Sequence, residues 1–173
     1  MGARERRKNL MEALRFDQMT DRLWDIKKKH GSTCKWLLKQ QKYLSWLNDD
    51  DFRRHKGFIW LKGKPGAGKS TIMKFAYENH KMKQSTGEFK SLLVASFFFH
   101  ARGDHLQKTV EGMFRSLTVQ LFEGYPDLQC LLDDSELISS ADTVCPSETR
   151  VQELFQRYRR PQGSPVCVLY RCA

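Results

Sequence analysis

The front of the chain alternates apolar and charged positions with a helical period. Within residues 4–29, apolar side chains recur every three to five positions with charges between them, which predicts an amphipathic helix. Gly31 is expected to end this helix, and Ser32 or Thr33 can cap a second one. The apolar face of that second helix would carry Trp36, Leu37, Tyr43, Leu44 and Leu47. We therefore interpret residues 1–56 as a helical lead-in.

From residue 57 the pattern changes to short, fully apolar runs that alternate with helical segments. Three runs have the length and composition of buried strands: residues 58–61, 92–99 and 166–170. Amphipathic segments between them predict helices at residues 70–81, 107–123 and 148–159. Strands that alternate with helices indicate an α/β domain with a parallel sheet flanked by helices, which we assign to residues 57–173.

One segment of this domain carries a specific motif. The residues from Gly63 to Ser70 read Gly-Lys-Pro-Gly-Ala-Gly-Lys-Ser and match the Walker A pattern of a P-loop at every position. A predicted strand enters the loop and a predicted helix leaves it, which is the context that the motif requires. A plain glycine-rich turn with a surface lysine is the alternative, but such a turn has no need of Lys-Ser at the start of a helix.

Each residue type in the loop has a chemical role. Glycines allow positive φ and let backbone N–H groups turn toward an anion. Lys69 can reach the β- and γ-phosphates, Ser70 can ligate a nucleotide-bound Mg²⁺, and Thr71 is placed for the α-phosphate. The predicted nucleotide-binding residues are Gly63, Pro65, Gly66, Ala67, Gly68, Lys69, Ser70 and Thr71. The expected cofactors are ATP or ADP with Mg²⁺.

No catalytic residue is predicted. Hydrolysis requires an acidic residue at the end of a neighbouring strand to hold Mg²⁺. The run at 166–170 is followed by Arg171 and Cys172, which are not acids. Residues 128–134 superficially resemble an acid-ended strand, but we interpret them as the end of a helix followed by an acidic turn.

Composition limits the partners and the compartment. The net charge is +10, and residues 1–56 contribute +7 of it. Basic charge can indicate nucleic-acid binding, but here we interpret it as a solvated helix face that also attracts nucleotide. The longest apolar run, residues 92–99, is too short to cross a bilayer, and no secretory signal is evident. We expect a cytoplasmic protein with reduced cysteines, no membrane partner, and no zinc site at His30 and Cys34.

Four blocks in fixed order carry a family resemblance. They are residues 14–22, residues 30–38, residues 57–71, and the stretch 96–117 that includes Ser-Phe-Phe-Phe-His-Ala-Arg-Gly. Together they resemble fungal NACHT-type P-loop NTPases of the STAND class, also described as nephrocystin-3-like N-terminal domains. The resemblance covers roughly residues 14–130.

The resemblance implies a signalling switch that exchanges ADP for ATP, self-associates or binds protein partners, and is joined to repeats such as ankyrin or WD. It also implies a sheet of strand order 5-1-4-3-2 and an acidic Walker B block near residues 166–170, where Arg171 and Cys172 stand instead. We therefore expect a truncated P-loop NTPase domain that binds nucleotide with little or no hydrolysis. Its P-loop strand would lack its usual neighbours, which would make the fold marginally stable.

Two other functions fit the same motif less well. A P-loop kinase for small molecules could use Arg157, Arg159 and Arg160 as a lid, but no acceptor-binding group accompanies them. A non-catalytic interaction module could dock a partner through the basic lead-in. The sequence contains no Asn-Lys-x-Asp guanine-binding block, which favours ATP over GTP only weakly because that block would lie beyond residue 173.

Overall fold

The computed structural model describes residues 2–47, 59, 61–86, 93–133, 149 and 166–171. The helical elements among these residues are α1 (Ala3–Leu14), α2 (Asp21–Asp25), η1 (Lys35–Lys39), α3 (Gln41–Leu47), α5 (Lys69–Ser85), η3 (Leu106–Lys108), α6 (Val110–Gly124) and η4 (Pro126–Asp133). The strands are β1 (Leu93–Phe98) and β2 (Val166–Arg171).

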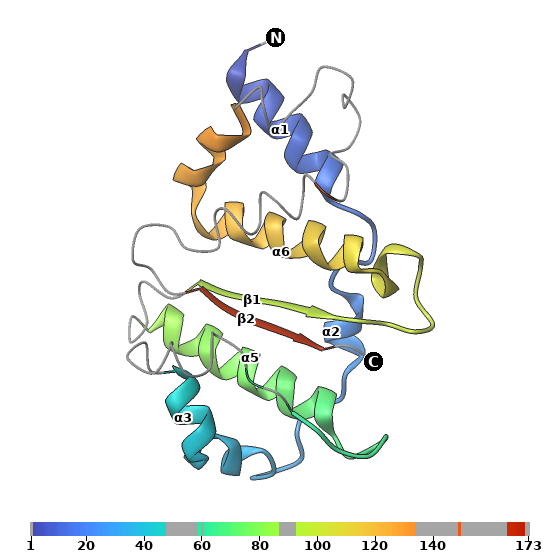
Figure 1. Ribbon diagram of the computed structural model, residues 1–173, viewed down its shortest axis with the longest axis vertical. Coiled ribbons are helices and arrows are strands. Elements are labelled where there is room, and N and C mark those ends of the chain that lie inside the picture. Colours follow the sequence, from blue (N-terminus) through green and yellow to red (C-terminus); the bar gives the residue numbers. More distant parts are fainter. Residues whose placement is uncertain are drawn as a thin grey trace.

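The two strands form a parallel pair between helices. Leu93 lies opposite Val166, and the register continues without a break to Phe98 opposite Arg171. Figure 1 shows α6 on one face of the pair and α5 on the other. Parallel strands covered on both faces are expected to be apolar throughout, and the described side chains of β1 are all buried. The predicted strands at residues 92–99 and 166–170 are thus confirmed.

Each face of β1 has its own core. Val94 packs on one side with Ile72 and Ala76 of α5, in a cluster that continues to Tyr43 and Trp46 of α3. On the other side, Ala95, Phe97 and Leu117 form the cluster shared with α6. The side chain of Gln120 accepts from Ser96 N at 3.0 Å and donates to Ser96 O at 2.9 Å, which joins α6 to the strand backbone.

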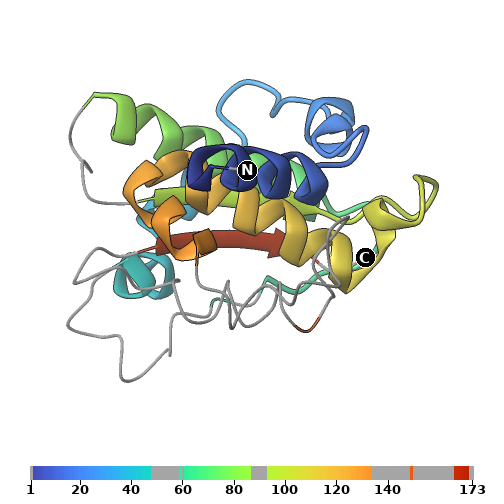
Figure 2. The ribbon, with the colours of Figure 1, turned by 90° about the horizontal axis from the view of Figure 1, so that it is seen from above.

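A further layer covers the outer side of α6. Figure 2 shows α1 lying across α6, with η4 beside it. Met11 and Leu14 of α1 pack there against Val119, Phe122 and Leu132. From α1 to α3, the layers in Figure 1 follow the order α1, α6, sheet, α5, α3.

The single helix predicted over residues 4–29 is wrong. The structure has α1 and α2 instead, and Gln18 between them adopts φ 61. The reason is a contact from far along the chain, because Arg115 donates to the carbonyl oxygens of Ala13 and Leu14. Those two carbonyl oxygens therefore accept hydrogen bonds from a side chain of α6 and not from N–H groups of a continuing helix.

The second lead-in helix is also divided. A 3₁₀ segment, η1, precedes α3, and Cys34 at its start has φ 75. The helix predicted at residues 107–123 is confirmed as α6, with Thr109 Oγ1 accepting from Gly112 N at 3.2 Å as its N-terminal cap. The helix predicted at residues 70–81 is confirmed and extends to Ser85.

Other predictions concern segments that the structure describes only in part. Residues 126–133 are helical as η4, which confirms a helical rather than a strand interpretation there. Of the predicted strand at 58–61, only Ile59 and Leu61 are described, and neither is assigned to a strand. The predicted helix at 148–159 lies outside the described residues except for helical residue 149. Within the described ranges, no helix has the length and apolar character needed to span a membrane.

Candidate phosphate-binding site

The loop at residues 61–68 leads into the N-terminal end of α5. Because α5 runs antiparallel to β1, this end lies at the edge of the sheet where β1 and β2 finish (Figure 1). In open α/β sheets, ligands bind outside the carboxyl ends of the strands. The predicted phosphate loop thus lies at the edge where such a site is expected.

Two glycines with positive φ determine the backbone conformation of the loop. Gly66 has φ 76 and Gly68 has φ 77, in the left-handed region that other residues adopt only with strain. A Cβ atom at either position would meet nothing within 4 Å, so the requirement for glycine is conformational and not steric. Between them, Ala67 N donates to Lys64 O at 3.2 Å and closes the turn.

The start of α5 carries a group of backbone donors without acceptors in the described part of the chain. The first helical bond runs from Ile72 N to Gly68 O at 2.9 Å. Before it, five N–H groups have no acceptor among the described residues: those of Gly66, Gly68, Lys69, Ser70 and Thr71. No acidic side chain lies in the first turn, and Gly68 has no side chain to cap it. These donors and the positive end of the helix dipole are available to an anion.

Lys69 is folded back over the loop. Its Nζ donates to Gly63 O and to Lys64 O, each at 2.8 Å. An ammonium group has three donors, so one remains available while these two bonds are made. Lys69 and Ser70 are both half-buried beside the exposed loop residues. The structure therefore brings together all the predicted site residues from Gly63 to Thr71 in one loop and helix start.

Comparison with known proteins gives one finding. The profile of the family described as "Nephrocystin 3, N-terminal" matches residues 32–169, which is most of the chain. The chain belongs to the nephrocystin 3 N-terminal family. Neither a curated protein nor a solved structure matches it. The nephrocystin-3-like part of the resemblance is therefore shown, and the match spans the candidate loop at residues 63–70 and β1.

No acidic residue stands at the described end of β2 in this chain. The last described residue of the strand is Arg171, which lies opposite Phe98. Cys172 lies outside the described residues. Among the residues that the structure describes, no three His, Cys, Asp or Glu side chains come together in a metal-binding group.

A buried lysine on the same helix was not predicted from the sequence. Lys74 of this nephrocystin 3 N-terminal domain is 3% exposed. Its Nζ donates to Leu23 O at 2.6 Å and to Ile26 O at 2.8 Å, at the C-terminal end of α2. The only sequence signal was a lysine among the apolar residues of a helix. Lys74 fixes α2 against α5.

Farther along α5, burial shifts the pKa values of three side chains. Burial lowers the pKa of His80, and the positive charge of Lys83 lowers it further. Burial raises the pKa of Tyr77, although a hydrogen bond with Ser96 opposes the rise. Burial also lowers the pKa of Lys81, against the opposing effect of Glu123. These groups lie toward the end of α5 away from the loop, so we give them no role in phosphate binding.

Proposed function

We propose that this chain binds the phosphates of ATP or ADP, with Mg²⁺, at the loop of residues 63–70. The supporting observation is the group of five backbone N–H donors at a left-handed glycine turn, with the ammonium of Lys69 beside it. A dianionic phosphate matches this set in charge and in the number of acceptors. The motif, the family match and the position at the carboxyl edge of the sheet support the same ligand.

Within this proposal, each side chain has a defined task. Lys69 exchanges the carbonyls of Gly63 and Lys64 for phosphate oxygens, which are charged and therefore stronger acceptors. Ser70 contributes its hydroxyl to a Mg²⁺ that bridges the phosphates. The metal neutralises charge on the nucleotide. Gly66 and Gly68 keep the donors of the loop turned outward.

The proposed activity is nucleotide-dependent switching with little or no hydrolysis. Phosphoryl transfer to water needs a carboxylate that fixes Mg²⁺ and a group that positions the water. The strand that would supply the carboxylate, β2, has Arg171 at its described end. We therefore place the chain with NACHT-type switches of the STAND class, acting through protein partners or self-association.

Calorimetric titration of the folded chain with Mg·ATP and Mg·ADP tests the proposal. Lys69→Ala should weaken binding by roughly 2–4 kcal/mol, because a charge-assisted phosphate contact is lost. Lys62→Ala removes the same charge just before the loop and should change affinity by less than about 1 kcal/mol. Saturable binding with this contrast supports the phosphate site.

Other outcomes would contradict it. If the folded chain binds no nucleoside di- or triphosphate in the presence of Mg²⁺, the phosphate site is absent and an interaction module is the better description. If Lys69→Ala and Lys62→Ala lower affinity equally, only the general positive charge contributes. Rapid phosphate release would contradict the second part of the proposal, that hydrolysis is slight.

A further inference from the structure

The stretch from the end of α2 to the end of α3 is basic throughout. Residues 27–47 contain six lysines and no acidic residue. Figure 1 shows α3, at the end of this stretch, as the outermost layer on the side of α5 away from the sheet. With the residues that the structure describes, five of the ammonium groups make no hydrogen bond or ion pair: those of Lys27, Lys28, Lys35, Lys39 and Lys42. This outer layer therefore carries positive charge that the described chain does not neutralise.

Two apolar side chains of the same layer are exposed, although their spacing predicted burial. The sequence placed Trp36 and Leu44 on the apolar face of the second lead-in helix, yet Trp36 is 51% exposed and Leu44 is 44% exposed. Trp36 and Lys39 lie on one side of η1, because residues three apart eclipse in a 3₁₀ helix. The layer thus combines an indole with lysines on its outer side, which the sequence alone did not show.

The inner side of the layer is committed to the core. Leu37, Tyr43 and Trp46 are buried in the cluster shared with α5. The hydroxyl of Tyr43 forms the hydrogen bond of 2.5 Å with His80 Nε2. The outer side chains are therefore carried on a backbone that is already ordered, which lowers the entropic cost of binding a partner.

We propose that this outer layer binds the surface of a membrane that contains anionic lipids. Each lysine close to such a surface strengthens binding about fivefold, because it neutralises charge on the headgroups. Trp36 and Leu44 supply the apolar area that enters the headgroup region, where indole rings are favoured. The sequence favoured a solvated basic face without a membrane partner, and the exposure of these two side chains is what changes that interpretation.

A nucleic acid matches this layer less well than a lipid surface. Leucine offers no aromatic face on which a base can stack. Residues 27–47 also contain no arginine, whose planar guanidinium is the better group for nucleic-acid recognition. Lysine is a compact and strongly hydrated charge, which suits a surface of mobile headgroups. The proposed binding is independent of the loop at residues 63–70 and needs no helix that spans the bilayer.

Cosedimentation of the folded chain with lipid vesicles tests the proposal. The chain should bind vesicles of phosphatidylcholine and phosphatidylserine but not vesicles of phosphatidylcholine alone. Binding should weaken as the salt concentration rises, because salt screens the charged surface. The triple variant Lys35→Gln/Lys39→Gln/Lys42→Gln should weaken binding about a hundredfold, since three lysine contacts are lost.

A second triple variant controls for net charge. Arg4→Gln/Arg6→Gln/Lys8→Gln removes three exposed positive charges from α1, which lies at the opposite end of the layers in Figure 1. This variant should bind anionic vesicles nearly as well as the parent chain. Lys69→Ala should also bind them like the parent, so that failure of the phosphate site leaves this proposal standing.

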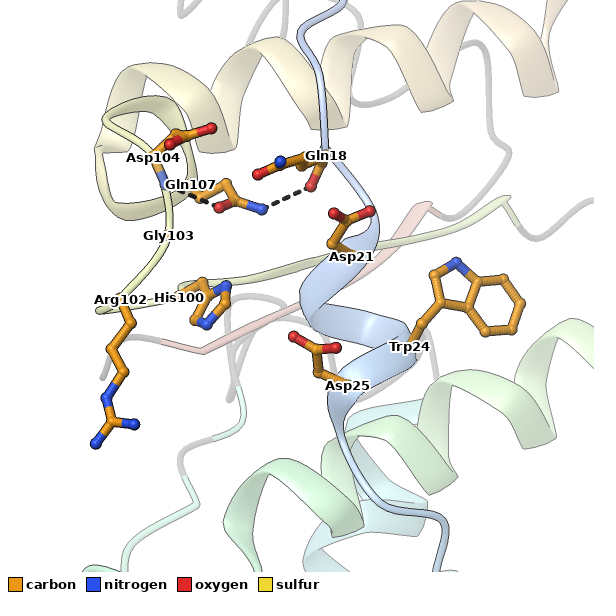
Figure 3. Close-up of a pocket in the computed structure, with 9 residues that line it drawn as sticks. All are labelled: Gln18, Asp21, Trp24, Asp25, His100, Arg102, Gly103, Asp104 and Gln107. Carbon is orange, nitrogen blue, oxygen red and sulfur yellow. Dashed lines mark hydrogen bonds between the residues drawn. The ribbon is translucent and has the colours of Figure 1, made fainter.

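The two exposed indoles provide a matched pair for the apolar contribution. Trp24 is 73% exposed, but Figure 3 shows it on the same short helix as Asp21 and Asp25, whose carboxylates repel an anionic surface. Trp24→Gln should therefore leave vesicle binding unchanged. Trp36→Gln should weaken binding while leaving its salt dependence as in the parent chain, because apolar area is lost and charge is not.

Four results would overturn the proposal, provided that far-ultraviolet circular dichroism shows the variants to be folded. The first is a parent chain that binds anionic vesicles no better than neutral ones. The second is an equal loss of binding in the two triple variants, and the third is parent-like binding by Trp36→Gln. The fourth is a chain that ignores the vesicles but binds a single-stranded RNA oligonucleotide through the same lysines, which would assign the layer to nucleic acid.

Discussion

At the scale of single residues, Gly103 and Gly112 are surrounded too closely to carry a side chain. A Cβ atom at Gly112 would lie 1.8 Å from Leu106 O and 2.6 Å from Leu106 C, which are backbone atoms. At Gly103 the nearest atom would be Gln107 Oε1, at 2.0 Å. The first obstacle is part of the main chain and can yield only if η3 moves, whereas the second is mainly the end of a side chain, with Gln107 Cβ at 2.9 Å as the one fixed atom.

This difference predicts unequal costs for the two alanine variants. Gly112→Ala should lower the free energy of unfolding by about 3 kcal/mol, because overpacking must displace backbone. Gly103→Ala should cost about 1–2 kcal/mol, since Gln107 can turn away and lose its bonds to Gln18 and Asp104. Urea unfolding measures both.

Gly2→Ala is the control for this pair, because a Cβ there meets nothing within 4 Å. Its unfolding free energy should remain within about 0.5 kcal/mol of the parent. Equal costs at Gly103 and Gly112 would show that η3 shifts as easily as a side chain.

The candidate site at residues 63–71 follows from a sequence motif and stays a prediction, whereas the buried polar contacts could not be predicted. Residues 63–71 are consecutive, and glycine, lysine and serine at fixed spacing have few other uses. Lys74 and Arg115 instead bind carbonyl oxygens 48 to 102 residues away. A carbonyl is the same in every residue, so no pattern of side chains indicates such a contact.

At the scale of elements, α5 connects the candidate site with two parts of the lead-in. Its first turn carries the free donors, and its second turn carries Lys74, which holds α2. Near its other end, His80 Nε2 and the hydroxyl of Tyr43 in α3 form a hydrogen bond of 2.5 Å. One helix thus joins the candidate loop at residues 63–68 to α2 and α3 of the lead-in.

Lys74→Met should loosen α2 while leaving α5 intact. The substitution keeps an apolar stem of similar length but removes the donor for two carbonyls, at a cost of about 1–3 kcal/mol. Hydrogen exchange of the amides at residues 21–26 should become faster, and that at residues 72–82 should change little. Lys108→Met, on an exposed lysine of η3, is the control. Unchanged exchange in α2 would contradict the role given to Lys74.

In the lead-in, the spacing of apolar residues did not predict where the first helix ends. Apolar spacing continues through residues 15–20, yet the helix stops at Leu14 because Arg115 binds its last carbonyls. In contrast, the C-terminal end of α6 was predicted to within one residue, because Pro126 follows it closely, whereas its start lies three residues later than predicted. Locally determined ends can be read from the sequence, and ends set by tertiary contacts cannot.

At the scale of the whole molecule, the lead-in and the sheet layers depend on a neutral histidine. His80 is 1% exposed between α5 and α3, and burial lowers its pKa from the ordinary value of 6.5. A group whose folded pKa is lowered binds protons more readily when unfolded. Its stabilising contribution is therefore complete above about pH 6.5 and is lost as the pH falls through the lowered pKa of the folded state.

His80→Gln should make the unfolding free energy less dependent on pH between about pH 7.5 and pH 5.5, because no proton is taken up at this position on unfolding. Urea unfolding at a series of pH values measures the slope. His105→Gln, on an exposed histidine, should retain the slope of the parent chain. A parent-like slope in His80→Gln would show that another group governs the acid response.

The anchors of the lead-in have a consequence for how this part of the protein can vary. Arg115, Gln107 and Lys74 bind residues 13–26 through peptide oxygens, in addition to the packing of Leu14 and the ion pair of Arg15 with Glu123. Solvent-facing substitutions in that stretch, apart from Arg15, leave these backbone contacts in place. Its outer surface can therefore diversify between related proteins while its docking on α5 and α6 stays the same, which suits a segment that must meet different molecules in different settings.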